Sequence, residues 1–202
     1  MYKKVLGLIL FSSTFVVVLS CGSGTETVYK SNTGSTENIK NISYFAPVYS
    51  FKDHESSTSR KGKYLVVYTN HAADSLFRVE SERYRIRKKI LPEDQEVSLK
   101  ILMELDSLFE EVITRESIKD VQIPPVLSSL LNDSSEQYFM GILVTPEMYR
   151  QHSEFKSITY HLLIMDSVTD RVSFYGRSSK RKRNGYVERF NKNMEEIYKS
   201  ME

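Results

Sequence analysis

The chain has 202 residues, is 40% hydrophobic and 27% charged, and carries a formal net charge of +2. These values are typical of a folded domain and exclude a polytopic membrane protein or a wholly disordered chain. So small a net charge does not by itself indicate a nucleic-acid partner. A single cysteine excludes a disulfide framework and a cysteine-rich zinc site.

The first predicted element is a secretory signal peptide. Lys3 and Lys4 form a short positive start, and residues 5–19 that follow are almost wholly apolar. A positive start, a short apolar run and a small residue before the cleavage point are the parts of such a signal. The apolar run is shorter than the roughly 20 residues that a helix needs to span a bilayer.

The end of this segment, Val18-Leu19-Ser20-Cys21, resembles the lipobox of bacterial lipoproteins. The resemblance implies cleavage before Cys21 and acylation of its sulfur and amine, with chains such as palmitate. Two or more acyl chains give stable membrane anchoring, whereas one holds a protein only marginally. Gly22 stands where some bacteria place the aspartate that retains a lipoprotein in the inner membrane, which favours the outer membrane. An uncleaved anchor or a plain secreted protein is the alternative.

The rest of the chain divides into a tether and one domain. We expect residues 1–20 to be removed, residues 21–41 to be a lipidated cysteine and flexible tether, and residues 42–202 to form a globular domain. The tether is rich in Ser, Thr, Gly and Asn, and it would reach roughly 25 Å as a random coil. Removal of the signal takes two lysines and leaves equal numbers of basic and acidic residues.

The first half of the domain predicts strands followed by a long helix. Strands are expected over 43–51, 63–69, 75–80 and 83–90, with Pro47 confining the first to a sheet edge. The helix is expected from Pro92 to Ile113 on helical spacing of apolar residues. Its predicted buried stripe consists of Val97, Ile101, Leu102, Leu105, Leu108, Phe109, Val112 and Ile113.

The second half predicts a similar mixture. A short helix opens at residues 124–125, and residues 138–144 read as a central strand. Thr145-Pro146-Glu147 indicates a helix start, extending to about Phe155. Strands over 158–166 and 171–176 form a hairpin, and residues 185–201 form a closing helix. These elements predict an α/β fold in which helices flank a single mixed β-sheet.

No catalytic motif, cofactor-binding loop or metal-ligand pattern is found in the sequence. The histidines, at positions 54, 71, 152 and 161, show no metal-ligand spacing, and we expect surface or structural roles for them. The predicted long helix carries acids at Glu104, Asp106, Glu110, Glu111 and Glu116, which are expected to form a solvated face. A hydrolytic site assembled only in three dimensions, from His71, Asp74 and a carboxylate, stays open as an alternative.

Two basic features are candidate binding sites. Arg83, Arg85 and Arg87 alternate along a predicted strand and are expected on one sheet face. The second feature is the segment 177–183, whose cations are Arg177, Lys180, Arg181, Lys182 and Arg183. A solvated loop is the simplest interpretation of this run. The alternative is contact with anionic lipid headgroups or an acidic partner.

The second half also resembles a family of periplasmic lipoprotein domains, which includes the curli-secretion lipoprotein and activators of penicillin-binding proteins. The matching stretches are residues 138–141, 160–166, 169–170 with 172–175, and the helix 187–201. Asp170 replaces the turn glycine usual in the family. The resemblance implies a binding or scaffolding module rather than an enzyme, and it does not imply pore formation.

Together these features predict a membrane-anchored, non-enzymatic binding module of the bacterial cell envelope. Its expected partners are the lipid bilayer, through Cys21, and another envelope protein or a wall component, with no nucleic acid. No cofactor is expected. The alternative is a lipid-anchored hydrolase.

Overall fold

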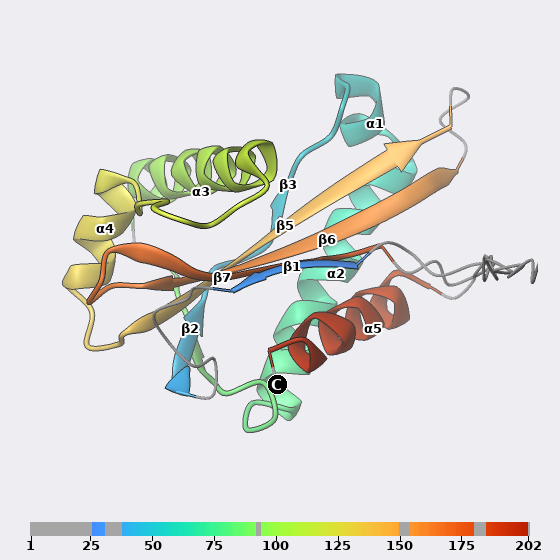
Figure 1. Ribbon diagram of the computed structural model, residues 1–202. Coiled ribbons are helices and arrows are strands. Elements are labelled where there is room, and N and C mark those ends of the chain that lie inside the picture. Colours follow the sequence, from blue (N-terminus) through green and yellow to red (C-terminus); the bar gives the residue numbers. More distant parts are fainter. Residues whose placement is uncertain (1–25, 31–37, 92–93, 150–153, 180–184, 202) are drawn as a thin grey trace, which may run out of the picture.

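A computed structural model describes residues 38–91, 94–149, 154–179 and 185–201, and the backbone of residues 26–30. It confirms the predicted α/β class: helices cover both faces of one mixed sheet (Figure 1). Two predicted features lie outside the described residues: the lipidation site Cys21 and the cations at 180–183.

The seven strands form one sheet in the order β1-β7-β6-β5-β2-β4, with β3 also paired to β5. The antiparallel half consists of β1 (Glu26–Lys30), β7 (Arg171–Ser178), β6 (Phe155–Asp166) and β5 (Tyr138–Met148). The parallel part adds β2 (Ile42–Tyr44), β3 (Val48–Tyr49) and β4 (Ile86–Lys89). The central β5–β6 hairpin is the longest pairing and organises the domain.

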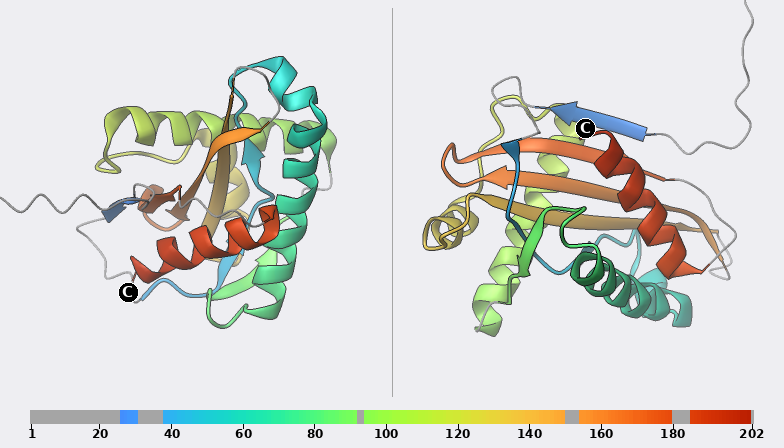
Figure 2. Two further views of the ribbon diagram at one scale, coloured as in Figure 1. Left: turned by 90° about the vertical axis from the view of Figure 1, so that its right-hand side faces the viewer. Right: turned by 90° about the horizontal axis from the view of Figure 1, so that it is seen from below.

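Each sheet face is buried beneath different helices. On one face lie α2 (Arg60–Val79), which follows the short α1 (His54–Thr58), and α5 (Tyr186–Lys199). On the other lie α3 (Gln95–Arg115) and α4 (Pro125–Asn132). The two buried clusters are separate because alternate residues of β5, β6 and β7 point to opposite faces. Figure 2 shows the sheet between these two layers.

The predicted strands 63–69 and 75–80 are wrong, because both stretches belong to the single helix α2. The buried residues of this helix are Gly62, Leu65, Thr69, Ala72, Ala73, Leu76 and Phe77. Their spacing follows the helical period across both stretches, although the β-branched and aromatic residues of each short stretch favour a strand locally. Burial of this continuous face against the sheet outweighs the local preference.

Two further predictions are corrected. The expected edge strand 43–51 is divided into β2 and β3, and β2 lies inside the sheet between β5 and β4. The helix expected at Thr145 is absent, because β5 continues through Pro146 to Met148. Proline is tolerated there because β3 pairs with β5 only as far as Val144, so the Pro146 nitrogen faces no strand on that side.

The remaining predicted elements are confirmed with small shifts of their ends. They are the long helix, now α3, the short helix α4, the central strand β5, the β6–β7 hairpin and the closing helix α5. In α3, Val97 and Leu102 were expected in the buried stripe, but both are exposed. The structure also differs within the predicted tether, where residues 26–30 form β1 and pair with β7.

Candidate interaction surfaces

The three arginines predicted to share a strand face do not do so. Arg83 and Arg85 lie in the turn that follows α2, and only Arg87 lies in a strand. Arg85 adopts a left-handed backbone with φ 55°, which breaks the alternation that the prediction requires. Each arginine makes a contact within the domain. Arg83 pairs with Glu80 and Glu195, Arg85 donates to the Ile39 carbonyl, and Arg87 pairs with Glu136.

Glu136 is a buried carboxylate that anchors the β4 edge of the sheet. Its residue is only 4% exposed, and its oxygens lie 3.1 Å from an Arg87 nitrogen and 3.2 Å from Lys88 Nζ. The Ser134 hydroxyl donates to the same carboxylate. Hydrogen bonding from Ser134, followed by the contacts of Lys88 and Arg87, holds the pKa of Glu136 below its ordinary value. Two of the strand's cations are therefore occupied in stabilising the fold.

The histidine–acid arrangement of the hydrolase alternative is not formed by His71 and Asp74. His71 lies on the exposed side of α2. Asp74 instead accepts from Lys89 Nζ, at 2.8 and 2.9 Å, and from the Tyr44 hydroxyl at 3.1 Å. Neither a hydrogen bond nor an ion pair joins these two described residues. His54 is exposed as well, and His152 lies outside the described residues.

The buried histidine, His161, belongs to a neutral hydrogen-bond network beneath α3. Its Nδ1 lies 2.8 Å from the Tyr175 hydroxyl, and its Nε2 lies 3.3 Å from Thr145 Oγ1. Burial, with a smaller contribution from Arg177, lowers the pKa of His161 to about 4. The imidazole is therefore neutral at physiological pH, and its two nitrogens bridge three neighbouring strands. This is a satisfied structural role rather than that of a general base.

A shallow groove of about 550 Å³ lies where α3 ends and α4 begins. Its lining includes the carboxyl-bearing residues Glu111 and Asp170 together with Gln122, Ser129 and Asn132, and no histidine or lysine is among the lining residues. Across the part of the chain that the structure describes, no cluster of three or more His, Cys, Asp or Glu could hold a metal ion. The polar groups that line the groove are therefore carboxylates, amides and hydroxyls.

The acids of α3 have two different roles. Glu104 faces α4, and its carboxylate accepts from the backbone N–H groups of Val126 at 3.3 Å and Leu127 at 2.7 Å. These are the first free amides of α4, whose own N-cap residue, Pro124, supplies no side-chain cap. Glu111 pairs with Arg115 within α3. Asp106 and Glu110 are exposed, and no ion pair joins either to another described residue.

Large apolar side chains are exposed along the first half of α3. Met103 is 65% exposed and Leu99 is 58% exposed, with Leu102 beside them. We define the α3 stripe by residues that recur at helical spacing on this exposed side: Leu99, Leu102, Met103, Asp106 and Glu110. The stripe is apolar at its start and acidic at its end. Leu91, before the helix, and Val97, on another side of it, are also exposed but do not belong to the stripe.

A second exposed surface lies on α2, against the other sheet face. We define the α2 face by Arg60, Lys61, Lys63, Tyr64, Val67 and Tyr68, which lie on one side of the helix. The Arg60 guanidinium lies 5.2 Å from the centre of the Tyr64 ring. Ring contacts then continue from Tyr64 to Tyr68 and from Tyr68 to Tyr186 of α5. Arg177 of the predicted basic segment is half-buried at the end of β7 and lies outside this face.

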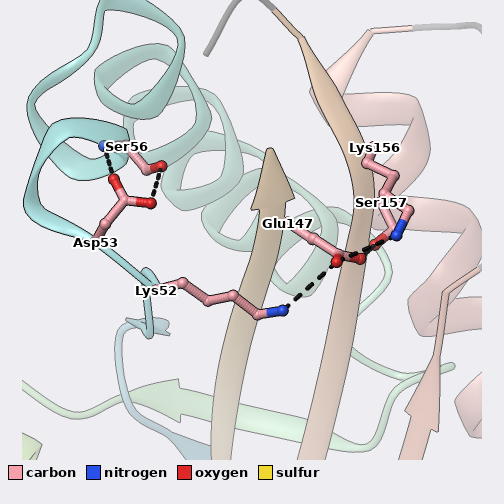
Figure 3. Close-up of polar contacts among 6 residues, drawn as sticks. All are labelled: Lys52, Asp53, Ser56, Glu147, Lys156 and Ser157. Carbon is pink, nitrogen blue, oxygen red and sulfur yellow. Dashed lines mark hydrogen bonds and ion pairs between the residues drawn. The ribbon is translucent and has the colours of Figure 1, made fainter. Parts of the chain in front are cut away.

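The outer end of the β5–β6 hairpin is tied to the chain that precedes α1. Figure 3 shows the Glu147 carboxylate between two lysines, 3.5 Å from Lys52 Nζ and 3.3 Å from Lys156 Nζ. The Ser157 hydroxyl donates to the same carboxylate at 3.2 Å. Asp53 caps α1 by accepting from the Ser56 amide and hydroxyl. These contacts hold α1 and the start of α2 beside the hairpin.

Comparison with known proteins gives similarity of structure only. No family model and no curated protein matches the sequence. Among solved structures, the PelC dodecamer from Paraburkholderia phytofirmans has 9% identity over 88% of this chain and 96% of that chain, with a TM-score of 0.44. Lipoprotein GNA1162 from Neisseria meningitidis has 11% identity over 81% and 96%, with a TM-score of 0.37.

The C-terminal domain of LpoB from Escherichia coli has 6% identity over 70% of this chain and 83% of that chain, with a TM-score of 0.36. The chain thus resembles bacterial proteins that include a lipoprotein. Matches at this level describe the general arrangement of helices and strands and do not assign a role. No described helix is both long enough and apolar enough to cross a membrane.

Proposed function

We propose that the protein is a bacterial lipoprotein, anchored through Cys21, whose domain binds another protein of the cell envelope without catalysing a reaction. The observation that carries the binding role is the α3 stripe. Exposed apolar side chains gathered on one helix mark protein contact sites more often than chance, because a helix of a soluble domain normally turns its apolar side inward. The outer membrane is the favoured location, since Gly22 follows the cysteine.

The stripe also indicates the chemistry of the partner. Its apolar half fits an apolar groove or helix face, and Asp106 and Glu110 at its other end fit a basic rim. Two exposed acids without ion pairs in the described chain leave charge for a partner to neutralise. We therefore infer a partner with an apolar centre flanked by lysine or arginine, rather than a polysaccharide.

The test is site-specific photocrosslinking in cells that make the full chain. A photoreactive residue at Met103 or Leu99 is expected to give one discrete protein adduct. The matched control is Val79, which is 73% exposed at the end of α2 and lies on the other side of the sheet. Asp106→Lys combined with Glu110→Lys is expected to weaken the Met103 adduct at least tenfold, because the rim charge is reversed.

Several outcomes contradict the proposal. Equal adducts from Met103 and Val79, or an adduct that charge reversal leaves unchanged, would show non-specific contact. An adduct whose mass is twice that of the chain would show that the partner is a second copy of this chain and not another envelope protein. Absence of any adduct from Leu99 and Met103, in cells where the chain is present at normal level, would remove the α3 stripe as a docking site.

A further inference from the structure

The first turn of α2 has a charge arrangement that opposes helix stability. Arg60, Lys61 and Lys63 lie there, and the turn contains no acid. The amino end of a helix carries a partial positive charge, so cations at this position are unfavourable. No ion pair joins these three residues to an acid of the described chain. An anion from outside the domain would relieve this repulsion.

Apolar and aromatic side chains stand beside these cations. Val67 is 61% exposed, and Tyr64 and Tyr68 are also exposed. Tyrosine combines an apolar ring with a polar hydroxyl and is enriched at the level of lipid headgroups. A helix side that combines lysine, arginine and such residues is typical of helices that lie on an anionic membrane surface. The α2 face therefore has the composition of a bilayer contact.

The pairing of β1 limits how far the domain can stand from the proposed anchor. Glu26 pairs with Ser178 at the end of β7, and Glu26 follows Cys21 by only five positions in the chain. Five residues span at most about 18 Å when fully extended. The expected tether of 20 residues is thus reduced to a short connection. Its length limits how far the end of the domain that carries the start of β1 can stand from the bilayer.

The same register shows which end this is. Ser178 pairs with Tyr160 of β6, and β6 begins five residues earlier at Phe155. At about 3.4 Å per residue, the hairpin extends roughly 17 Å beyond Tyr160. The start of β1, the outer end of the hairpin and the first turns of α2 and α5 lie toward the same end of the molecule (Figures 1 and 2). The connection from Cys21 to Glu26, when extended, is therefore about as long as the part of the hairpin that projects beyond Tyr160.

We propose that the α2 face rests on the anionic lipid headgroups of the bilayer in which Cys21 is anchored. This inference rests on the lipidation in the proposed function. The anchor supplies attachment, and the α2 face fixes orientation. The first half of α3 lies away from this end in Figure 1. In this orientation it is far from the membrane and accessible to a partner. Each cation near an anionic surface strengthens surface binding about fivefold.

The chain contains no tryptophan, so one introduced residue is a clean fluorescent reporter. Val67→Trp reports on the α2 face, and Val79→Trp is the control, exposed on the same helix about 18 Å away along its axis. The acylated full chain is reconstituted into phosphatidylcholine vesicles with or without phosphatidylglycerol, each containing brominated lipid as a quencher. Vesicle flotation and intact mass report anchoring independently.

We expect the brominated lipid to quench Val67→Trp at least twofold more than Val79→Trp in the anionic vesicles. The quenching should fall toward the control level when Arg60, Lys61 and Lys63 are changed to glutamate, with anchoring retained. Equal quenching at both positions, in a chain that floats with the vesicles, would overturn the inference and leave the proposed function intact. Equal quenching with and without phosphatidylglycerol would overturn the headgroup recognition. A chain without acyl mass that fails to float would overturn the anchoring on which both depend.

Discussion

At the scale of single residues, His161 shows how a polar side chain is accommodated in the core. It is 5% exposed, and both ring nitrogens have partners, Tyr175 and Thr145. The sequence predicted a structural role for a histidine that interrupts a strand, and the contacts confirm it. The network could not be predicted from sequence, because its three members come from three strands and meet only through sheet register.

The first prediction concerns the pH dependence of stability. His161 has a pKa of about 4 in the folded chain and about 6.5 when unfolded. Between these values the unfolded chain binds more protons, so stability present above pH 6.5 is lost as pH falls toward 4, by roughly 3 kcal/mol over the whole window. Urea unfolding of the chain from Gly22 onward at pH 7, 6 and 5 measures this loss.

His161→Gln is the control for this prediction. Glutamine keeps hydrogen-bonding capacity but does not titrate, so the variant is expected to lose less stability than the wild type between pH 7 and 5, whatever its stability at pH 7. The buried carboxylate Glu136 has a lowered pKa, so its contribution is lost only at lower pH. Identical pH profiles for the two proteins would contradict the assignment of this loss to His161.

At the scale of elements, α4 depends on a cap supplied by another helix. Glu104→Ala removes the acceptor for the Val126 and Leu127 amides and is expected to destabilise the domain by about 1–2 kcal/mol. Glu110→Ala is the matched control, because it removes an exposed carboxylate from the same helix and should change stability by less than about 0.5 kcal/mol. Urea denaturation compares them, and equal effects would contradict the cap.

Element prediction succeeded where one signal extended over a whole element and failed where short windows competed. The apolar period of α3 continues over its length, so it was predictable. In α2, two strand-like windows concealed one helix, since its buried period becomes visible only across both. Pro146 gave a false helix signal, because its compatibility with β5 depends on the absence of a neighbouring strand at that position. Exposure of Leu102 likewise depends on which helix side meets the sheet.

At the scale of the whole molecule, the proposals give the domain two different ends. The α2 face and the short connection to Cys21 lie toward one end, and the apolar half of the α3 stripe lies toward the other. Neither surface was predicted from sequence. Both require knowledge of which helix sides remain exposed and of how β1 pairs. The arginines predicted as a binding site, Arg83, Arg85 and Arg87, each make a contact within the domain, and their role in binding stays a prediction.

The central claim, that the protein is a lipid-anchored module, is tested most directly by intact mass spectrometry of the full chain isolated from bacterial membranes. The account predicts a chain that begins at Cys21, heavier than its sequence by two or more acyl groups. Cys21→Ala should abolish both the cleavage at this position and the added mass. A wild-type chain that retains residues 1–20, or that begins elsewhere without acyl groups, would contradict the account.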